Sequence, residues 1–182
     1  APRFNPQNGL KIVPGFEPAN GQSTFSAYTL VYDVKLPTQS GLASIFQSDL
    51  NNVTDGDLWL NFREGNAVIG TNGQEEGNLP LDKWLRVVVT LERVGEGGST
   101  FVLNKYVDGV LQGTQTVGSA FEIGAGGFLI FADDSSETPL FSLSSFAFVE
   151  KALSAAEVTA LGGATASGPF AGSIEGVNLV QF

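Results

Sequence analysis

Histidine, cysteine and methionine are absent from the 182 residues of this chain. Without histidine or cysteine, the chain can form neither a Cys/His zinc site, nor a Ser-His-Asp triad, nor a thiol nucleophile. No disulfide can form either, so the sequence does not indicate the redox compartment in which the protein folds. These absences exclude several common catalytic chemistries before any motif is considered.

Charged residues are also scarce, at 15% of the chain, and basic residues are the scarcer kind. Nine Lys and Arg against 19 Asp and Glu give a formal net charge of −10. No basic cluster offsets this charge, so no nucleic-acid partner is expected. The surplus carboxylates fit cation binding or simple solubility. No run of 18 apolar residues occurs, so no membrane association is expected. The start at Ala1 without a signal peptide indicates a processed piece of a longer, multidomain protein.

Glycine and phenylalanine are abundant, with 23 and 14 residues, and hydrophobic residues make up 42% of the chain. This composition predicts many strands joined by tight turns. In residues 24–37, apolar side chains alternate with polar ones such as Asp33, and in 83–94 they alternate with Arg86 and Glu92. Each alternation predicts a strand with one buried and one solvated face. Further strands are predicted at 10–13, 41–48, 57–62, 67–71 (after a turn at 64–66), 100–117 (a hairpin), 127–132, 140–150 and 172–182.

Three local signals refine this pattern. Asp108-Gly109 is typical of a type I′ hairpin turn. The apolar phase slips at Ser144–Ser145, which indicates a bulge or bend. Ser154 and Glu157 have the spacing of a capping box, which predicts a short helix at Ala155–Leu161. Many short strands and a single helix predict an all-β fold, a β-sandwich of two antiparallel sheets, and residues 1–182 are expected to form one domain.

Six segments together resemble a known family: "AYTLVYDVKLP", "FQSDLNNVTDGDLWLN", "NLPLDKWLRVVVTLER", "KYVDGV", "FLIFADD" and "FAFVEKALSAAEVTALGG". Their order and spacing over residues 24–163 are similar to those of laminin-G-like, concanavalin A-like jelly-roll domains of secreted bacterial proteins. The resemblance implies a jelly-roll sandwich and an extracellular location. It also implies a carbohydrate or protein ligand and, as in many members of the family, a calcium ion on one rim.

The stretch "DLNNVTDGDLW" at 49–59 contains the oxygen ligands that calcium prefers. It is no EF-hand loop, because Val53 and Thr54 replace an expected ligand and the glycine. A second acidic cluster, "ADDSSE" at 132–137, also follows an apolar strand and could lie on the same rim. A bound cation would relieve the repulsion between these carboxylates. The alternative is that both segments are solvated turns. The candidate calcium ligands are Asp49, Asn52, Asp55, Asp57, Asp133 and Asp134, with Asp49, Asp57 and Asp133 favoured.

Two other chemistries receive little support. Asn52-Val53-Thr54 is a glycosylation sequon, but sequons arise often by chance and the resemblance is bacterial. Glycosidases of this fold carry paired carboxylates along one strand face, and the nearest pair here, Asp55 and Asp57, lies in a turn. A lyase pair of Lys105 and Tyr106 is disfavoured because adjacent strand residues point to opposite faces. We therefore expect no enzymatic activity.

Aromatic residues are candidate sugar platforms, because sugars stack on flat rings. The candidate platforms are Trp59, Phe62, Trp84 and Tyr106, and core packing is the favoured role for any one of them. Trp59 and Tyr106 are the candidate ligand-binding residues. Trp84 begins a predicted strand and is expected to pack in the core. Arg86 and Lys105 are expected on solvated strand faces.

The sequence thus predicts a non-catalytic extracellular module, stabilised by calcium, that binds carbohydrate as an accessory to a larger secreted or surface protein. Two alternatives remain open: a protein-interaction or adhesion module without a sugar site, and a structural spacer beside another domain.

Overall fold

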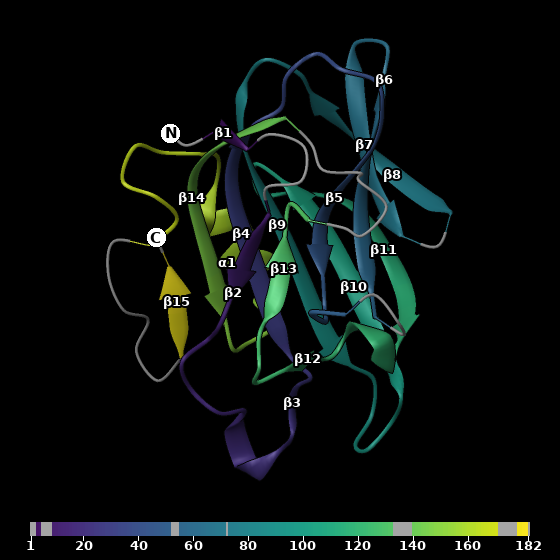
Figure 1. Cartoon of the computed structure of the whole chain (residues 1–182), viewed down its shortest axis with the longest axis vertical. Helices are drawn as coiled ribbons and strands as arrows, with labels where there is room; N and C mark the ends of the chain where they lie inside the picture. Colours follow the sequence, from purple (N-terminus) through teal and green to yellow (C-terminus); the bar gives the residue numbers. More distant parts are fainter. Residues whose placement is uncertain are drawn as a thin grey trace.

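The computed structural model describes residues 3–4, 9–51, 55–71, 73–132, 140–170 and 178–181. Two antiparallel sheets lie face to face, and the short helix packs on the far side of one of them (Figure 1). The predicted all-β sandwich of two antiparallel sheets is therefore confirmed. No helix in the described ranges is long and apolar enough to cross a membrane.

The larger sheet has seven strands in the order β1-β14-β4-β9-β10-β11, with β15 also paired to β14. Their bounds are β1 Arg3–Phe4, β4 Tyr28–Lys35, β9 Trp84–Arg93, β10 Thr100–Val107, β11 Val110–Gly118, β14 Phe141–Val149 and β15 Leu179–Gln181.

The second sheet has six strands in the order β2-β13-β5-β6-β7-β8. Their bounds are β2 Leu10–Ile12, β5 Gly41–Gln47, β6 Asp57–Arg63, β7 Asn66–Thr71, β8 Gln74–Pro80 and β13 Phe128–Ile130. A small pair, β3 (Thr24–Phe25) and β12 (Ile123–Gly124), lies at one end of the sandwich, beside the 3-10 turn η2 (Ser119–Phe121). A second 3-10 turn, η1, spans Ala19–Gly21.

The core between the sheets is rich in phenylalanine. Phe128 lies at its centre, with ring centroids 5.7 Å from Phe46 and 5.3 Å from Phe148. Each buried ring of this kind removes a large apolar area from water, so the core is the main source of stability. Two tyrosines, Tyr28 and Tyr32, are also fully enclosed, and burial raises the pKa of both hydroxyls well above the ordinary value of 10.0.

The local signals in the sequence are confirmed. Asp108 and Gly109 have φ angles of 48° and 82°, as a type I′ turn requires. The register of β14 against β4 shifts between Leu143 and Ser145. The helix α1 spans Ala155–Leu161 with both hydrogen bonds of its capping box, and the Lys151 hydrogen bond, aided by Ser154, lowers the pKa of Glu157 to about 2. Strand β8 was not predicted, because its sequence is polar and lacks alternation.

The outer face of the seven-stranded sheet is buried where α1 covers it, which corrects the predicted solvent exposure of Asp33 and Arg86, whereas Glu92 on the same face is exposed as predicted. A second apolar cluster covers the buried part, made of Val31, Val88, Tyr106, Ala147, Leu153 and Val158. Beneath it, the Arg86 guanidinium donates two hydrogen bonds to Asp33, at 2.7 and 2.8 Å, and one to the Leu161 carbonyl at the end of α1, at 2.6 Å. Arg86 is 1% exposed and Asp33 is fully buried. Their pairing is what makes the burial of both charges tolerable.

Lys105 is also buried, and the prediction that it faces solvent is wrong. Its side chain points between the sheets, where its ammonium contacts the Glu76 carboxylate at 2.6 Å and donates to Gln115. Glu76 comes from β8 and Lys105 from β10, so the contact joins the two sheets at one edge. Gly113 makes room for it, because a Cβ there would lie 1.9 Å from the Glu76 carboxylate.

Replacing Glu76 with glutamine should therefore destabilise the fold. The ammonium of Lys105 would stay buried against a neutral amide, at a cost of about 2–3 kcal/mol in the free energy of unfolding. Glu75→Gln is the matched control, because Glu75 pairs with the exposed Arg63 and should cost at most about 1 kcal/mol. Urea denaturation measures both, and equal effects would contradict the assignment.

The effect of Glu76→Gln should also depend on pH. Burial lowers the pKa of Lys105 from 10.5, opposed by the hydrogen bond and charge of Glu76. Between the lowered pKa and 10.5 the unfolded chain binds more protons, so the contribution of this lysine to stability rises with pH. Losing Glu76 lowers the folded pKa further. The stability difference between wild type and variant should be largest near pH 7 and shrink toward pH 10.5; a constant difference would argue against this.

Candidate functional site

The acidic loop between β5 and β6 is closed at its base by Ser48 and Gly56. The Ser48 backbone N–H donates to the Gly56 carbonyl at 3.1 Å, and the Gly56 N–H donates to the Ser48 hydroxyl at 2.8 Å. The same hydroxyl donates to the Ala120 carbonyl of η2 at 2.5 Å. The loop and η2 are thus held together as one end of the sandwich.

Gly56 is the point where the loop rests on η2. A Cβ at this position would lie 2.6 Å from the Phe121 ring, which is closer than side-chain carbons approach one another. Phe121 is only 3% exposed and belongs to the main core. The Tyr28 hydroxyl donates to the Phe121 carbonyl at 2.8 Å and fixes η2 from the opposite sheet. Only glycine therefore allows the acidic loop to pack this closely.

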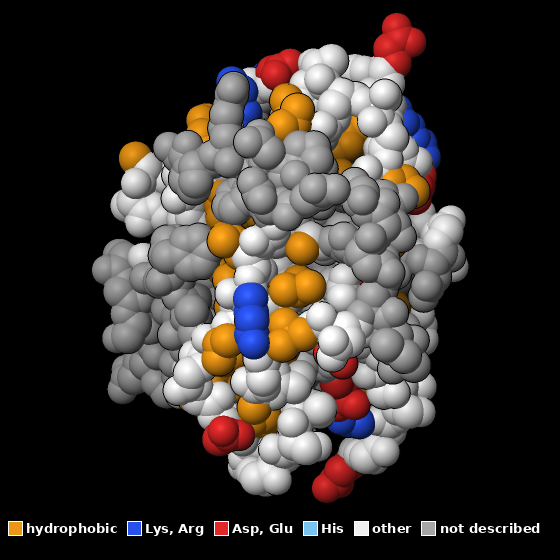
Figure 2. Space-filling model, viewed as in Figure 1, with side chains coloured by type: hydrophobic (Ala, Val, Ile, Leu, Met, Phe, Trp, Pro, Cys, Tyr) orange, Lys and Arg blue, Asp and Glu red, His pale blue; other side chains and the backbone are white. Residues whose placement is uncertain are grey.

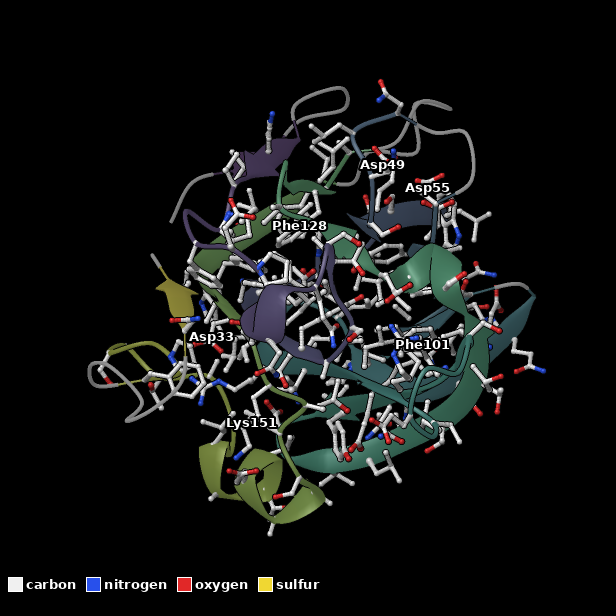
Figure 3. All side chains as sticks on the ribbon, turned by 90° about the horizontal axis from the view of Figure 1, so that it is seen from below. Asp33, Asp49, Asp55, Phe101, Phe128 and Lys151 are labelled. Carbon is white, nitrogen blue, oxygen red and sulfur yellow. The ribbon has the colours of Figure 1, made fainter. Side chains whose placement is uncertain are left out.

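A cavity of about 360 Å³ opens between the loop and η2, and we call it the rim cavity. Several acidic side chains lie at the lower end of the face seen in Figure 2, where β3 and β12 lie in Figure 1, and others lie at its upper end. Asp49 and Asp55, from the loop, both line the cavity and are near each other in Figure 3. Its lining consists of Thr24, Ser48, Asp49, Leu50, Asp55, Ser119, Ala120, Glu122, Gly124, Gly126 and Gly127.

The predicted calcium ligands are thus only partly brought together. Asp49 and Asp55 face one cavity, whereas Asp57 begins β6 opposite Gln47 and is not part of the lining. Asn52, Asp133 and Asp134 lie outside the described residues, so their place in the site stays a prediction, as does the sequon that contains Asn52. Within the described ranges, no three acidic side chains are arranged to hold a metal ion together.

Asp49 is held in a defined orientation. Its Oδ1 accepts hydrogen bonds from the backbone N–H groups of Leu50, at 2.5 Å, and Asn51, at 3.2 Å. This local side-chain-to-backbone pattern shapes the start of the loop. These two hydrogen bonds fix the position of Oδ1 and therefore also the direction in which Oδ2 points.

Glu122 completes the cavity from the opposite wall and was missed by sequence reasoning. It follows η2 and accepts hydrogen bonds on Oε1 from the Thr24 hydroxyl, at 3.0 Å, and from Arg93, at 2.5 Å. Arg93 also donates to the Gly98 carbonyl and lies 4.8 Å above the Phe101 ring. Glu122 belongs to no recognisable motif and to no alternating pattern, so no signal in the sequence indicates its role.

The candidate aromatic platforms fare differently. Tyr106 is 5% exposed beneath α1, so its assignment as a ligand-binding residue is wrong, and burial raises the pKa of its hydroxyl. Phe62 is in the core. Trp59 is half-buried on the outer side of the six-stranded sheet, opposite Gly70. Trp84 is 44% exposed at the start of β9, so its predicted core position is wrong. Because the two tryptophans belong to different sheets, they do not form one platform.

Residues 17–159 match the family model described as "Concanavalin A-like lectin/glucanases superfamily". The chain belongs to this superfamily. The resemblance stated from the sequence is therefore confirmed. Comparison with curated proteins found no match.

Solved structures show the same concanavalin A-like fold at low sequence identity. The native heptameric SAP-like pentraxin from Limulus polyphemus is 18% identical, with a TM-score of 0.55, over 79% of this chain and 78% of the pentraxin chain. NanB with Optactamide is 13% identical, with a TM-score of 0.55, over 90% of this chain and 27% of NanB. Botulinum neurotoxin type C, whose cell entry depends on two ganglioside molecules, is 17% identical, with a TM-score of 0.50, over 76% of this chain and 36% of the toxin chain. This concanavalin A-like chain thus spans about a quarter to a third of the latter two.

The packing of Gly56 against Phe121 can be tested directly. Gly56→Ala should lower the free energy of unfolding by about 1–3 kcal/mol, because the new methyl group forces η2 and the acidic loop apart. Gly118→Ala is the control, since a Cβ there meets nothing within 4 Å. Urea denaturation of both variants measures the difference. A Gly56→Ala protein as stable as the control would show that the loop does not rest on η2.

Proposed function

We propose that this domain is a non-catalytic carbohydrate-binding module, part of a longer secreted or surface protein, that acts outside the cell and binds its ligand in the rim cavity. The observation that supports this most strongly is the cavity itself. Its walls come from three segments far apart in the sequence, and its lining combines carboxylates, hydroxyls and glycine backbone. A volume of about 360 Å³ lies within the range of small-molecule sites.

The chemistry of the lining suits a sugar. Carboxylates accept hydrogen bonds from ligand hydroxyls, and such charge-assisted bonds are stronger than neutral ones. A Cβ at Gly124 or Gly126 would meet nothing within 4 Å, so a ligand can approach the backbone closely at these two positions. The carboxylates of Asp49 and Glu122 are held by protein donors in loops, rather than paired across a strand face as in glycosidases. This arrangement favours binding over catalysis.

Calcium is part of the proposal. Asp49 and Asp55 face the same cavity and supply the hard oxygen ligands that calcium prefers, and further oxygens would come from the loop backbone and water. A bound ion would neutralise the loop and hold it against η2. Asn52, Asp133 and Asp134 remain further predicted ligands.

Calcium binding predicts a melting temperature that depends on the ion. At a calcium concentration about 100-fold above its Kd, the melting temperature should exceed that in EDTA by roughly 5–10 °C. The double variant Asp49→Asn, Asp55→Asn should lose this difference. Glu64→Gln, in the exposed turn between β6 and β7, should keep it. Identical melting curves of the wild type in EDTA and in millimolar calcium would overturn the calcium part of the proposal.

Trp59 is the proposed second contact, for a glycan long enough to reach the outer side of the six-stranded sheet. Beside it, Glu75 accepts a hydrogen bond from the Asn61 amide at 2.8 Å and pairs with Arg63, which gives a row of polar groups next to an aromatic ring. Trp59→Ala should weaken binding of such a glycan by roughly threefold to tenfold. Trp84→Ala, on the other sheet, should leave it unchanged. Titration calorimetry measures the affinity of both variants, and equal affinities would show that Trp59 does not contact the glycan.

A further inference from the structure

Glu122 is built into the rim cavity as a fixed acceptor. Its Oε1 is engaged by Thr24 and Arg93, and its side chain is 16% exposed. Its Oε2 receives no hydrogen bond from the residues that the structure describes. A carboxylate held this way loses little freedom when a ligand binds, which favours affinity. The open carboxylate oxygen can accept a hydrogen bond from a hydroxyl group but can donate none.

Asp49 offers the same arrangement on the opposite wall. Its Oδ1 is engaged by the two backbone N–H groups at the start of the loop, and among the described residues its Oδ2 has no donor. Two acceptors therefore line one cavity from two sides. A ligand with several hydroxyl groups can donate hydrogen bonds to both carboxylates, whereas a ligand that carries only acceptor groups cannot.

The balance of charge in the cavity also selects against anions. Asp49, Asp55 and Glu122 contribute three negative charges, and Arg93 contributes one positive charge beside them, which leaves two negative charges. The guanidinium of Arg93 is already engaged by Glu122 and the Gly98 carbonyl. A bound calcium ion would bring the net charge of the cavity to zero but would not make it positive. In neither state do the described side chains leave a surplus cation for an acidic sugar, and the chain as a whole carries a net charge of −10.

We infer that the rim cavity selects neutral, hydroxyl-rich sugars over acidic ones, and that Glu122 is a residue that determines this specificity. The inference rests on the proposed carbohydrate-binding function and adds to it the class of ligand. Uronic acids, sialic acids and sulfated sugars are excluded by repulsion from Glu122 and Asp49.

The first experiment compares immobilised glycans. Neutral probes are laminarin, mannan and xylo-oligosaccharides, and acidic probes are alginate, polygalacturonate and sialyllactose, each tested in millimolar calcium and in EDTA. At least one neutral probe should bind, and every acidic probe should bind at least roughly tenfold more weakly. Binding of no probe would overturn the proposed function. Equal or tighter binding of an acidic probe would overturn the inference alone.

The second experiment assigns the selectivity to Glu122. Glu122→Gln keeps the shape of the side chain but removes its charge and releases Arg93. Binding of the neutral probe should weaken by roughly tenfold, because an acceptor that makes a charge-assisted hydrogen bond is lost. Binding of the acidic probes should strengthen. Glu92→Gln is the matched control, because it changes the net charge equally at an exposed position on the same strand as Arg93.

A third variant separates the effect of the charge of Glu122 from the effect of its side-chain length. Glu122→Asp keeps the charge but withdraws the carboxylate from the cavity, so neutral binding should weaken with no gain in acidic binding. Melting curves check that each variant is folded. A Glu122→Gln protein that retains wild-type preference, or a Glu92→Gln protein that shifts as much, would show that Glu122 does not determine specificity.

Discussion

The hydrogen bond from the Tyr28 hydroxyl to the Phe121 carbonyl is the interaction on which the rim cavity depends. It crosses from β4 to η2 through the buried core, where an unsatisfied hydroxyl would be costly. Gly56 packs against the Phe121 ring, and the Ser48 hydroxyl donates a hydrogen bond to the Ala120 carbonyl. The acidic loop is therefore positioned by the core of the sandwich, and this position makes Asp49 and Asp55 part of the cavity lining.

Two ion pairs, Arg86–Asp33 with both side chains buried and Lys105–Glu76 with only the lysine fully buried, constrain the same sandwich elsewhere. Arg86 and Asp33 lie under α1 and connect β9 and β4 to the end of the helix, whereas Lys105 and Glu76 join the two sheets at one edge. The charges of Arg86, Asp33 and Lys105 are expensive to bury alone, so each requires its partner in place. These requirements define where the helix docks and how the sheet edges meet, which apolar packing by itself specifies less sharply.

Much of the fold could be predicted because its signals are local. Alternation located most strands, the turn at Asp108-Gly109 has the φ angles that its residues favour, and the capping box marks the start of α1. The prediction failed where a side chain meets something distant. The alternation of a strand predicts which face of the sheet Arg86 points to, but it does not predict that a helix covers that face. The sequence of β8 is polar, and it forms a strand because it pairs with β7.

The candidate site divides in the same way. The sequence by itself determined the sandwich of two antiparallel sheets and placed Asp49 and Asp55 in one short loop, because pattern and proximity along the chain suffice for both. Only the tertiary structure decided that Glu122, rather than a residue of any motif, forms the opposite wall, and that Tyr106 is buried while Trp84 is exposed. These outcomes depend on contacts between segments far apart in the chain, which no local preference encodes.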